Sequence, residues 1–114
     1  MAQFEFIAWL AKWLLQQADF EFDWDHGNST KSVRKHGIKV EGAEQVFRNK
    51  ECLIPLGIQI SPVVDEPRFG ALGMDLAGNK LSVCFTIRSG KVRVISIRPM
   101  SSAERRMYGS LREE

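Results

Sequence analysis

The chain has 114 residues, of which 44% are hydrophobic and 26% are charged. This length corresponds to one domain, and the composition is ordinary for a globular protein that buries its own core, which argues against disorder and against a disulfide scaffold. The sequence contains no run of 18 apolar residues, so we expect no membrane-spanning helix.

The net charge of +2 is distributed unevenly along the chain. Residues 1–66 hold 7 basic and 10 acidic side chains, whereas residues 67–112 hold 9 basic and 2 acidic ones. A basic half that is rich in arginine is compatible with a phosphate-rich partner. Solvated surface arginines would give the same pattern, so charge alone leaves both interpretations open.

The two cysteines, Cys52 and Cys84, are too few for a disulfide framework and lack the spacing of metal ligands. We interpret them as buried thiols in a reducing compartment. The N-terminal apolar stretch contains Glu5 and Lys12 and has no basic leader, so it does not resemble a secretory signal. These features predict a cytoplasmic protein.

Residues 4–17 predict a helix that is apolar on most of its circumference. Such a helix must be buried, paired or embedded. Packing onto its own domain is the simplest interpretation, self-association through this helix is the second, and attachment to a membrane surface by Trp9 and Trp13 is the third. We do not expect a membrane partner.

The next segments alternate between strand and helix patterns. Residues 20–24 (FEFDW) alternate aromatic and acidic side chains, which predicts a half-buried strand. Asn28 or Ser29 is placed to cap a helix that runs through residue 36, and Gly37 is placed to stop it.

The middle of the chain predicts one more short helix and an interrupted strand. Residues 41–48 predict a helix whose inward positions are Ala43, Val46 and Phe47. Residues 52–60 look extended, but Pro55 and Gly57 indicate an edge or a break. Residues 61–67 predict a loop.

The last third predicts strands followed by a helix. Strands are expected at 68–75, 80–88 and 91–98, with a turn at 77–79. Ser89-Gly90 predicts a tight hairpin, and residues 101–104 (SSAE) form a capping box that opens a C-terminal helix.

The hairpin predicts a register that sorts side chains onto two faces. A two-residue turn pairs Ile87 with Val92, Phe85 with Val94, and Val83 with Ser96. The paired residues form an apolar face that must meet helices, and basic residues occupy the other face. Arg98 falls on the apolar side in this register, where its charge needs a partner or must protrude beyond the sheet.

Common motifs of cofactor enzymes are absent from the sequence: it has no phosphate-binding glycine loop, no dinucleotide fingerprint and no nucleophile elbow. His26 and His36 have no neighbouring cysteine cluster, so we expect no metal and no cofactor. What is present is a set of basic and proton-transfer groups: Lys31, Lys35, His36, Glu66, Arg68, Arg88, Arg93, Arg98 and Tyr108. Such a set suits metal-free RNA cleavage, which needs a base, an acid and cations around the phosphate, although each residue taken singly could be an ordinary surface or core residue.

Several ordered segments resemble BrnT-type toxins. They are FDWD at 22–25, Asn28 and Lys31, KHGI at 35–38, EGAEQVF at 41–47, RFGALG at 68–73, TIRSGKVRVISIR at 86–98 and ERRMY at 104–108. The resemblance covers residues 20–108 in collinear order. It implies a BrnT-like toxin domain at 20–114, preceded by an extra N-terminal amphipathic helix at 1–19.

The resemblance implies an α+β fold with a small antiparallel sheet packed with helices, related to RelE-like ribonucleases. It also implies a metal-independent endoribonuclease toxin of a type II toxin–antitoxin module. A cognate antitoxin protein would neutralise the toxin, RNA would be the substrate, and operator DNA would be bound only through the antitoxin. The alternative is a degenerate, non-catalytic subunit of such a module that binds nucleic acid or a partner.

By position, the resemblance implies six site residues: Lys35, His36, Glu66, Arg68, Arg88 and Arg98. The three arginines would bind phosphate and stabilise transition-state charge. His36 or Glu66 would move the proton, and Lys35 would assist electrostatically. The loop at 61–67 departs from the usual family pattern, so an ion pair with Arg68 is the alternative for Glu66.

Overall fold

The computed structural model of the protein describes residues 2–112, without the side chains of residues 32–34. Met1, the first residue of the predicted N-terminal segment 1–19, lies outside the described residues. So do Glu113 and Glu114, the last residues of the predicted toxin domain 20–114. The elements in chain order are β1 (Gln3–Glu5), α1 (Ala8–Gln16), α2 (His26–His36), α3 (Val40–Arg48), η1 (Lys50–Cys52), β2 (Ile54–Ser61), β3 (Phe69–Met74), β4 (Lys80–Arg88), β5 (Lys91–Pro99) and α4 (Ser102–Arg112). The predicted α+β class is confirmed.

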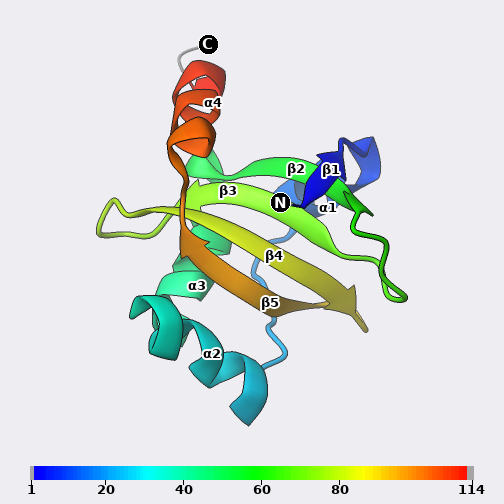
Figure 1. Ribbon diagram of the computed structural model, residues 1–114. Coiled ribbons are helices and arrows are strands. Elements are labelled where there is room, and N and C mark those ends of the chain that lie inside the picture. Colours follow the sequence, from blue (N-terminus) through cyan, green and yellow to red (C-terminus); the bar gives the residue numbers. More distant parts are fainter. Residues whose placement is uncertain (1, 113–114) are drawn as a thin grey trace.

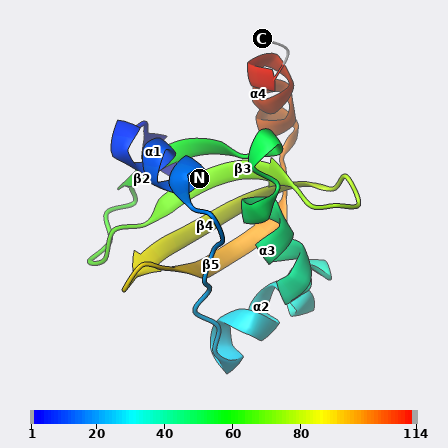
Figure 2. The ribbon, with the colours of Figure 1, turned by 180° about the vertical axis from the view of Figure 1, so that it is seen from behind.

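The five strands form one antiparallel sheet in the order β1-β2-β3-β4-β5. Helices α1 and α3 lie behind this sheet in Figure 1 and in front of it in Figure 2, which turns the molecule around. We call the covered side the closed face and the opposite side the open face. Helix α4 stands at one end of the sheet, and α2 lies beside β5 (Figure 1).

The main core fills the closed face. Inward residues of β3, β4 and β5 meet apolar residues of α1, α3 and the segment before α2, and the largest contributors are Leu10, Leu14, Phe20, Val46, Phe47, Phe69, Val83, Phe85, Val92 and Val94. The rings of Phe47 and Phe85 meet edge to face, with centroids 4.9 Å apart. Burying each large side chain contributes about 1.5–3 kcal/mol, so this face supplies most of the stability.

A smaller apolar cluster lies under α4 and covers one end of the open face. It consists of Leu72, Met100 and Tyr108, all buried. The Tyr108 hydroxyl donates a hydrogen bond to the carbonyl of Cys52, which anchors α4 to the chain before β2. Tyr108 is only 1% exposed, so it serves as this anchor and is not accessible as a proton donor.

The predicted N-terminal helix is shorter than expected. Residues 3–5 form strand β1 on the edge of β2, and the helix begins only at Ala8. Gly57 permits this pairing, because a Cβ there would lie 1.8 Å from the carbonyl oxygen of Glu5. Leu10 and Leu14 are fully buried in the main core, so the helix packs onto its own domain as expected.

The predicted strand at 20–24 is wrong as a regular strand. Phe22 forms a single parallel bridge with Val92, and the Asp23 N–H donates to the Val92 carbonyl at 2.8 Å. The alternation that suggested a strand is real, because Phe20 is buried while Glu21 is exposed. This segment runs along the edge of β5 and extends the sheet by one bridge only.

Helix α2 begins earlier than predicted, and its cap is Asp25. The Asp25 carboxylate accepts the N–H of Asn28 at 3.0 Å, and the Asn28 side-chain oxygen accepts the N–H of Asp25 at 2.7 Å. This reciprocal pair satisfies two backbone donors at the helix start. At the other end Gly37 has φ 69°, the left-handed geometry expected of a helix stop.

The middle segments follow their predictions closely. Helix α3 buries Ala43, Val46 and Phe47 as expected. Strand β2 is continuous but carries a register shift between Pro55 and Gly57, where a break was predicted. Proline is tolerated in this interior strand because β1 pairs only with residues 58–61.

The hairpin between β4 and β5 turns at Ser89 and Gly90, both with positive φ, as a two-residue turn requires. The predicted pairs Ile87–Val92 and Phe85–Val94 are confirmed.

The third predicted pair of the hairpin, Val83 with Ser96, is wrong. A bulge next to Phe85 shifts the register, so that Val83 pairs with Ile97 instead. The shift moves Arg98 to a position opposite Ser82, on the open face. The prediction that Arg98 lies on the apolar side is therefore wrong, because β5 contains one extra residue at the bulge.

Candidate functional site

The centre of the open face is built from small and polar residues. Gly70, Cys84 and Ser96 pair across three adjacent strands. Gln59 approaches from β2, with its side-chain oxygen 4.0 Å from the Cys84 sulfur. No helix covers this centre in Figure 1, where it faces the viewer. A ligand here would meet strand backbone and short side chains.

Two cations, Arg68 and Lys31, lie close enough to this centre to affect the Cys84 thiol. Burial raises the pKa of the Cys84 thiol, and the positive charges of Arg68 and Lys31 partly oppose that rise. Within residues 2–112 as described, neither cation takes part in a salt bridge. Arg68 and Lys31 therefore add positive charge near the centre of the open face.

Glu66 and Arg88 form an ion pair where β4 ends at the hairpin. The Arg88 Nη2 donates to a Glu66 oxygen at 3.1 Å, and about half of each side chain is exposed. The alternative pairing of Glu66 with Arg68 is not what the structure contains. The hydrogen bond from Arg88 holds the pKa of Glu66 below its ordinary value, which makes this carboxylate a weaker base.

Arg98 is engaged at the opposite end of the face. Its guanidinium donates to both oxygens of Glu104, at 2.7 and 3.0 Å. Glu104 also accepts the N–H of Ser101 in the predicted capping box, so Arg98 anchors the start of α4. Arg98 lies opposite Ser82, six residues along β4 from Arg88, which separates the two arginines by about 20 Å. They cannot share one phosphate.

Arg93 lies on the edge strand β5 and is held by two aspartates. Its guanidinium is 2.7 Å from Asp25 and 3.6 Å from Asp23, and its side chain is 17% exposed. The hydrogen bond from the Asn28 N–H holds the pKa of Asp25 below its ordinary value, and the hydrogen bond from Arg93 acts in the same direction. The Asn28 amide donates to the Val94 carbonyl at 3.1 Å. These residues fasten α2 to β5, a structural role that sequence reasoning did not assign.

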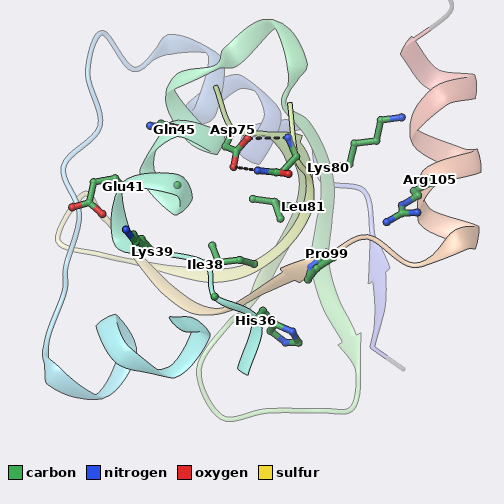
Figure 3. Close-up of a pocket in the computed structure, with 13 residues that line it drawn as sticks. His36, Ile38, Lys39, Glu41, Gln45, Asp75, Lys80, Leu81, Pro99 and Arg105 are labelled. Atoms are coloured by element: carbon green, nitrogen blue, oxygen red, sulfur yellow. Dashed lines mark hydrogen bonds between the residues drawn. The ribbon is translucent and has the colours of Figure 1, made fainter. Parts of the chain in front are cut away.

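His36 lies in a separate groove between α3, the β3–β4 turn and the start of α4. Figure 3 shows His36 and Arg105 on opposite sides of Pro99, with Lys80 on the same rim as Arg105. The groove has a volume of about 480 Å³, and the acidic residues that line it are Glu41 and Asp75. Asp75 is occupied by the β3–β4 turn, where it accepts hydrogen bonds from the backbone and side chain of Asn79.

The six predicted site residues thus fall into separate places. Lys35 is exposed on α2 and does not line the groove that contains His36. Glu66 pairs with Arg88, Arg98 pairs with Glu104, and Arg68 and Lys31 each act on the Cys84 thiol through their charge. Lys31 belonged to the wider set of candidate cations, but its place beside Arg68 depends on how α2 packs along β5.

The described part of the chain holds neither a cluster of metal ligands nor a membrane-spanning helix. No three His, Cys, Asp or Glu side chains among these residues gather as metal ligands. None of their helices has the length and apolar character needed to cross a membrane.

A sheet with one face sealed by helices and a cationic centre on the other is an arrangement suited to binding a polyanion. Residues 24–104 match the family model described as ribonuclease toxin, BrnT, of type II toxin–antitoxin system. The match spans more than half of the chain, so this protein belongs to the BrnT toxin family. No curated protein matches the chain. The family match begins after β1 and α1, so these two elements lie outside the matched region.

Proposed function

We propose that this protein is a metal-independent endoribonuclease toxin that binds RNA across the open face of its sheet. The observation that supports the proposal most directly is the pair Arg68 and Lys31 beside Cys84, two cations without an acidic partner among the described residues. The membership in a family of ribonuclease toxins points to RNA as the polyanion.

The proposed reaction uses the RNA's own 2′-hydroxyl as the nucleophile. A base takes the proton of this hydroxyl while its oxygen bonds to the adjacent phosphorus, and the bond from phosphorus to the 5′-oxygen breaks. An acid then protonates the departing oxygen, which leaves a 2′,3′-cyclic phosphate and a 5′-hydroxyl. A cation beside the reacting phosphate would stabilise its extra negative charge during this step: Arg68 if Glu66 is the base, and Lys80 or Arg105 of the separate groove if His36 is.

His36 and Glu66 are the two candidate proton carriers in this proposal, and they lie at separate places on the molecule. The imidazole of His36 is exposed at the rim of the groove, and Arg105 and Lys80 line the opposite rim. Glu66 is the second candidate, and its lowered pKa makes it a less effective base. A well-placed acid–base group contributes about 10²–10⁴-fold to the rate, so its loss is readily measured.

The other predicted site residues extend the surface beyond the reacting phosphate. Arg88 can exchange Glu66 for an RNA phosphate, because water screens an ion pair that is half exposed. Arg98 is held more firmly, by its two hydrogen bonds to Glu104. It would stay in place and add positive charge to the surface that binds RNA. Lys35 adds positive charge on the exposed side of α2.

The proposal includes a cognate antitoxin that neutralises the toxin and supplies the contacts to operator DNA. Support comes from the family's type II toxin–antitoxin context. Expression of the toxin alone should arrest bacterial growth, and co-expression of the neighbouring antitoxin gene should restore it. Growth that is unaffected by the toxin alone would contradict the toxin proposal.

The deciding experiment measures cleavage of labelled cellular RNA by the purified protein in EDTA. His36→Ala should lower the cleavage rate by about 10²–10⁴-fold while RNA affinity is largely kept, and Arg68→Ala should lower both. His26→Ala is the matched control, because it removes an exposed histidine from the other end of α2. Lys12→Ala removes one exposed positive charge from helix α1, behind the sheet, and should leave cleavage intact.

Two results of the cleavage experiment would contradict the proposal. Cleavage that persists at the wild-type rate in both His36→Ala and Arg68→Ala would show that the proposed site is wrong. An absence of cleavage by the wild type, with salt-sensitive RNA binding retained, would identify a non-catalytic, nucleic-acid-binding subunit of such a module.

A further inference from the structure

Strand β1 brings an aromatic ring onto the open face. Phe4 pairs with Gln59 of β2, and its ring lies directly over Gly70 of β3. A Cβ at position 70 would lie 2.7 Å from two carbons of the Phe4 ring, so glycine at this position is what admits the ring. The N-terminal addition therefore contributes a side chain to the centre of the candidate site.

The Phe4 ring lies next to the cationic centre. Gly70 pairs with Cys84, whose thiol experiences the charge of Arg68. Arg68 precedes Gly70 by two residues, and its carbonyl accepts the N–H of Gln59 at 2.7 Å, which continues the β2–β3 pairing. Side chains two residues apart on a strand project from the same face. Phe4 and Arg68 are therefore neighbours on the open face.

The exposure of Phe4 distinguishes it from the structural phenylalanines of the sheet. Phe69 and Phe85 on the closed face are 4% and 0% exposed, whereas Phe4 remains partly accessible to solvent. An accessible aromatic ring beside an arginine is the pairing that holds a nucleobase and its phosphate.

We propose that Phe4 stacks against one nucleobase of the bound RNA while Arg68 holds a phosphate of the same nucleotide. The inference rests on the proposed function only in taking RNA as the ligand of the open face. It assigns a binding role to the N-terminal addition, which lies outside the segment that matches the family model.

The test measures binding of the full-length protein to a short single-stranded 2′-O-methyl RNA, which cannot be cleaved because its 2′-hydroxyl is blocked. Phe4→Leu keeps an apolar side chain over Gly70 but removes the aromatic face. It should weaken binding by about 5- to 150-fold, the loss expected for one stacked base. Phe4→Tyr retains the ring and should bind like the wild type.

The control variant is Phe6→Leu, which changes a phenylalanine of the same segment that is 63% exposed and is not part of the proposed site. It should leave binding unchanged. An oligonucleotide of equal length that lacks bases should bind the wild type and Phe4→Leu equally, because only the phosphate contacts are left. Equal affinity of Phe4→Leu and wild type for the base-containing RNA would overturn the inference, as would an equal loss on the baseless strand.

A crosslinking measurement on the wild type keeps the inference testable if Phe4→Leu unfolds. Irradiation of the protein with a bromouracil-containing 2′-O-methyl RNA should attach the base to the peptide that contains Phe4. Attachment only to other peptides would overturn the inference. If the wild type cuts RNA but Phe4 proves irrelevant, the proposed function stands without this inference. If it binds RNA through Phe4 but does not cut, the catalytic proposal fails and the inference stands.

Discussion

The two faces of the sheet are formed by the same strands but differ in composition and in role. On the closed face, alternate residues of β3, β4 and β5 are apolar and buried against α1 and α3. On the open face, the next residues along the same strands are small, polar or basic, and most of the arginines are paired with a carboxylate. The difference shows that stability depends on one face, while the other is left free for charge and shape.

The pairs on the open face also differ from one another. Arg98 and Glu104 lock the start of α4, whereas Arg88 and Glu66 are half exposed and easily exchanged. Arg68 and Lys31 add positive charge near Cys84, and neither forms a salt bridge among the described residues. Substitutions that separate stability from RNA binding therefore test whether the two faces are independent.

The largest expected effect is on the closed face, at the N-terminal helix. Leu14→Ala should lower the free energy of unfolding by about 2–5 kcal/mol, because it opens a cavity in the shared core. Leu15→Ala changes the neighbouring residue, which is 61% exposed, and should stay within about 0.5 kcal/mol. Urea denaturation measures both. Equally small losses of stability in Leu14→Ala and Leu15→Ala would mean that α1 is not part of the core.

The next effect compares two glycines of β3 that face opposite sides. A Cβ at Gly73 would lie 2.8 Å from a methyl carbon of buried Val46, so Gly73→Ala should cost about 1–3 kcal/mol of stability. Gly70→Ala would displace the Phe4 ring, which can move toward solvent. It should cost less stability in urea denaturation but weaken RNA binding. A larger stability loss at Gly70 would contradict the division between the faces.

A smaller effect concerns acid stability at Glu104. Burial raises the pKa of this carboxyl, but hydrogen bonds from Arg98 and from the Ser101 N–H outweigh burial and hold it below its ordinary value of 4.5. The stabilisation is therefore present above about pH 4.5 and is lost as pH falls through the lowered pKa. Glu104→Gln should be about 1–2 kcal/mol less stable at pH 7, with a smaller difference near pH 3.

The measurement is thermal unfolding of Glu104→Gln and wild type across this pH range. Glu51→Gln, at an exposed carboxylate of η1, provides the comparison and should change stability by no more than about 0.5 kcal/mol at neutral pH. A constant difference between Glu104→Gln and wild type at all pH values would show that the carboxylate charge is not what stabilises the start of α4.

The smallest effect on stability is expected at Glu66. Glu66→Gln should leave the melting temperature unchanged, because the ion pair with Arg88 is screened by water. It should nevertheless tighten RNA binding, since Arg88 becomes available to a phosphate. The slope of log K against log salt should steepen by about 0.7, the value for one more phosphate contact on a single strand. An unchanged slope would remove Arg88 from the RNA surface.

Much of the fold was readable from local patterns. Alternation predicted β4 and β5, Ser89-Gly90 predicted their turn, and Ser101 with Glu104 predicted the start of α4. These features depend on residues close together in the sequence, for which periodicity and hydrogen-bonding chemistry are sufficient. The start of the first helix was mispredicted because a distant strand competed with the local pattern: residues 3–5 pair with β2 instead of joining the helix.

The candidate site was less readable, because it depends on contacts between distant residues. The residue types of Arg68, Arg88 and Arg98 indicated a cationic surface, but nothing local shows that Glu66 pairs with Arg88 or that Glu104 binds Arg98. A single bulge decided which face Arg98 occupies. The placement of Phe4 over Gly70 joins residues 66 positions apart in the chain.

The sequence by itself therefore determined the α+β class, the hairpin turn, the cap of α4 and the family, because each depends on local spacing or on an ordered set of motifs. Only the tertiary structure decided which cations are paired with a carboxylate among the described residues, and that the N-terminal helix belongs to the same core. The physical reason is that burial and ion pairing are set by neighbours in space, and strand register determines those neighbours.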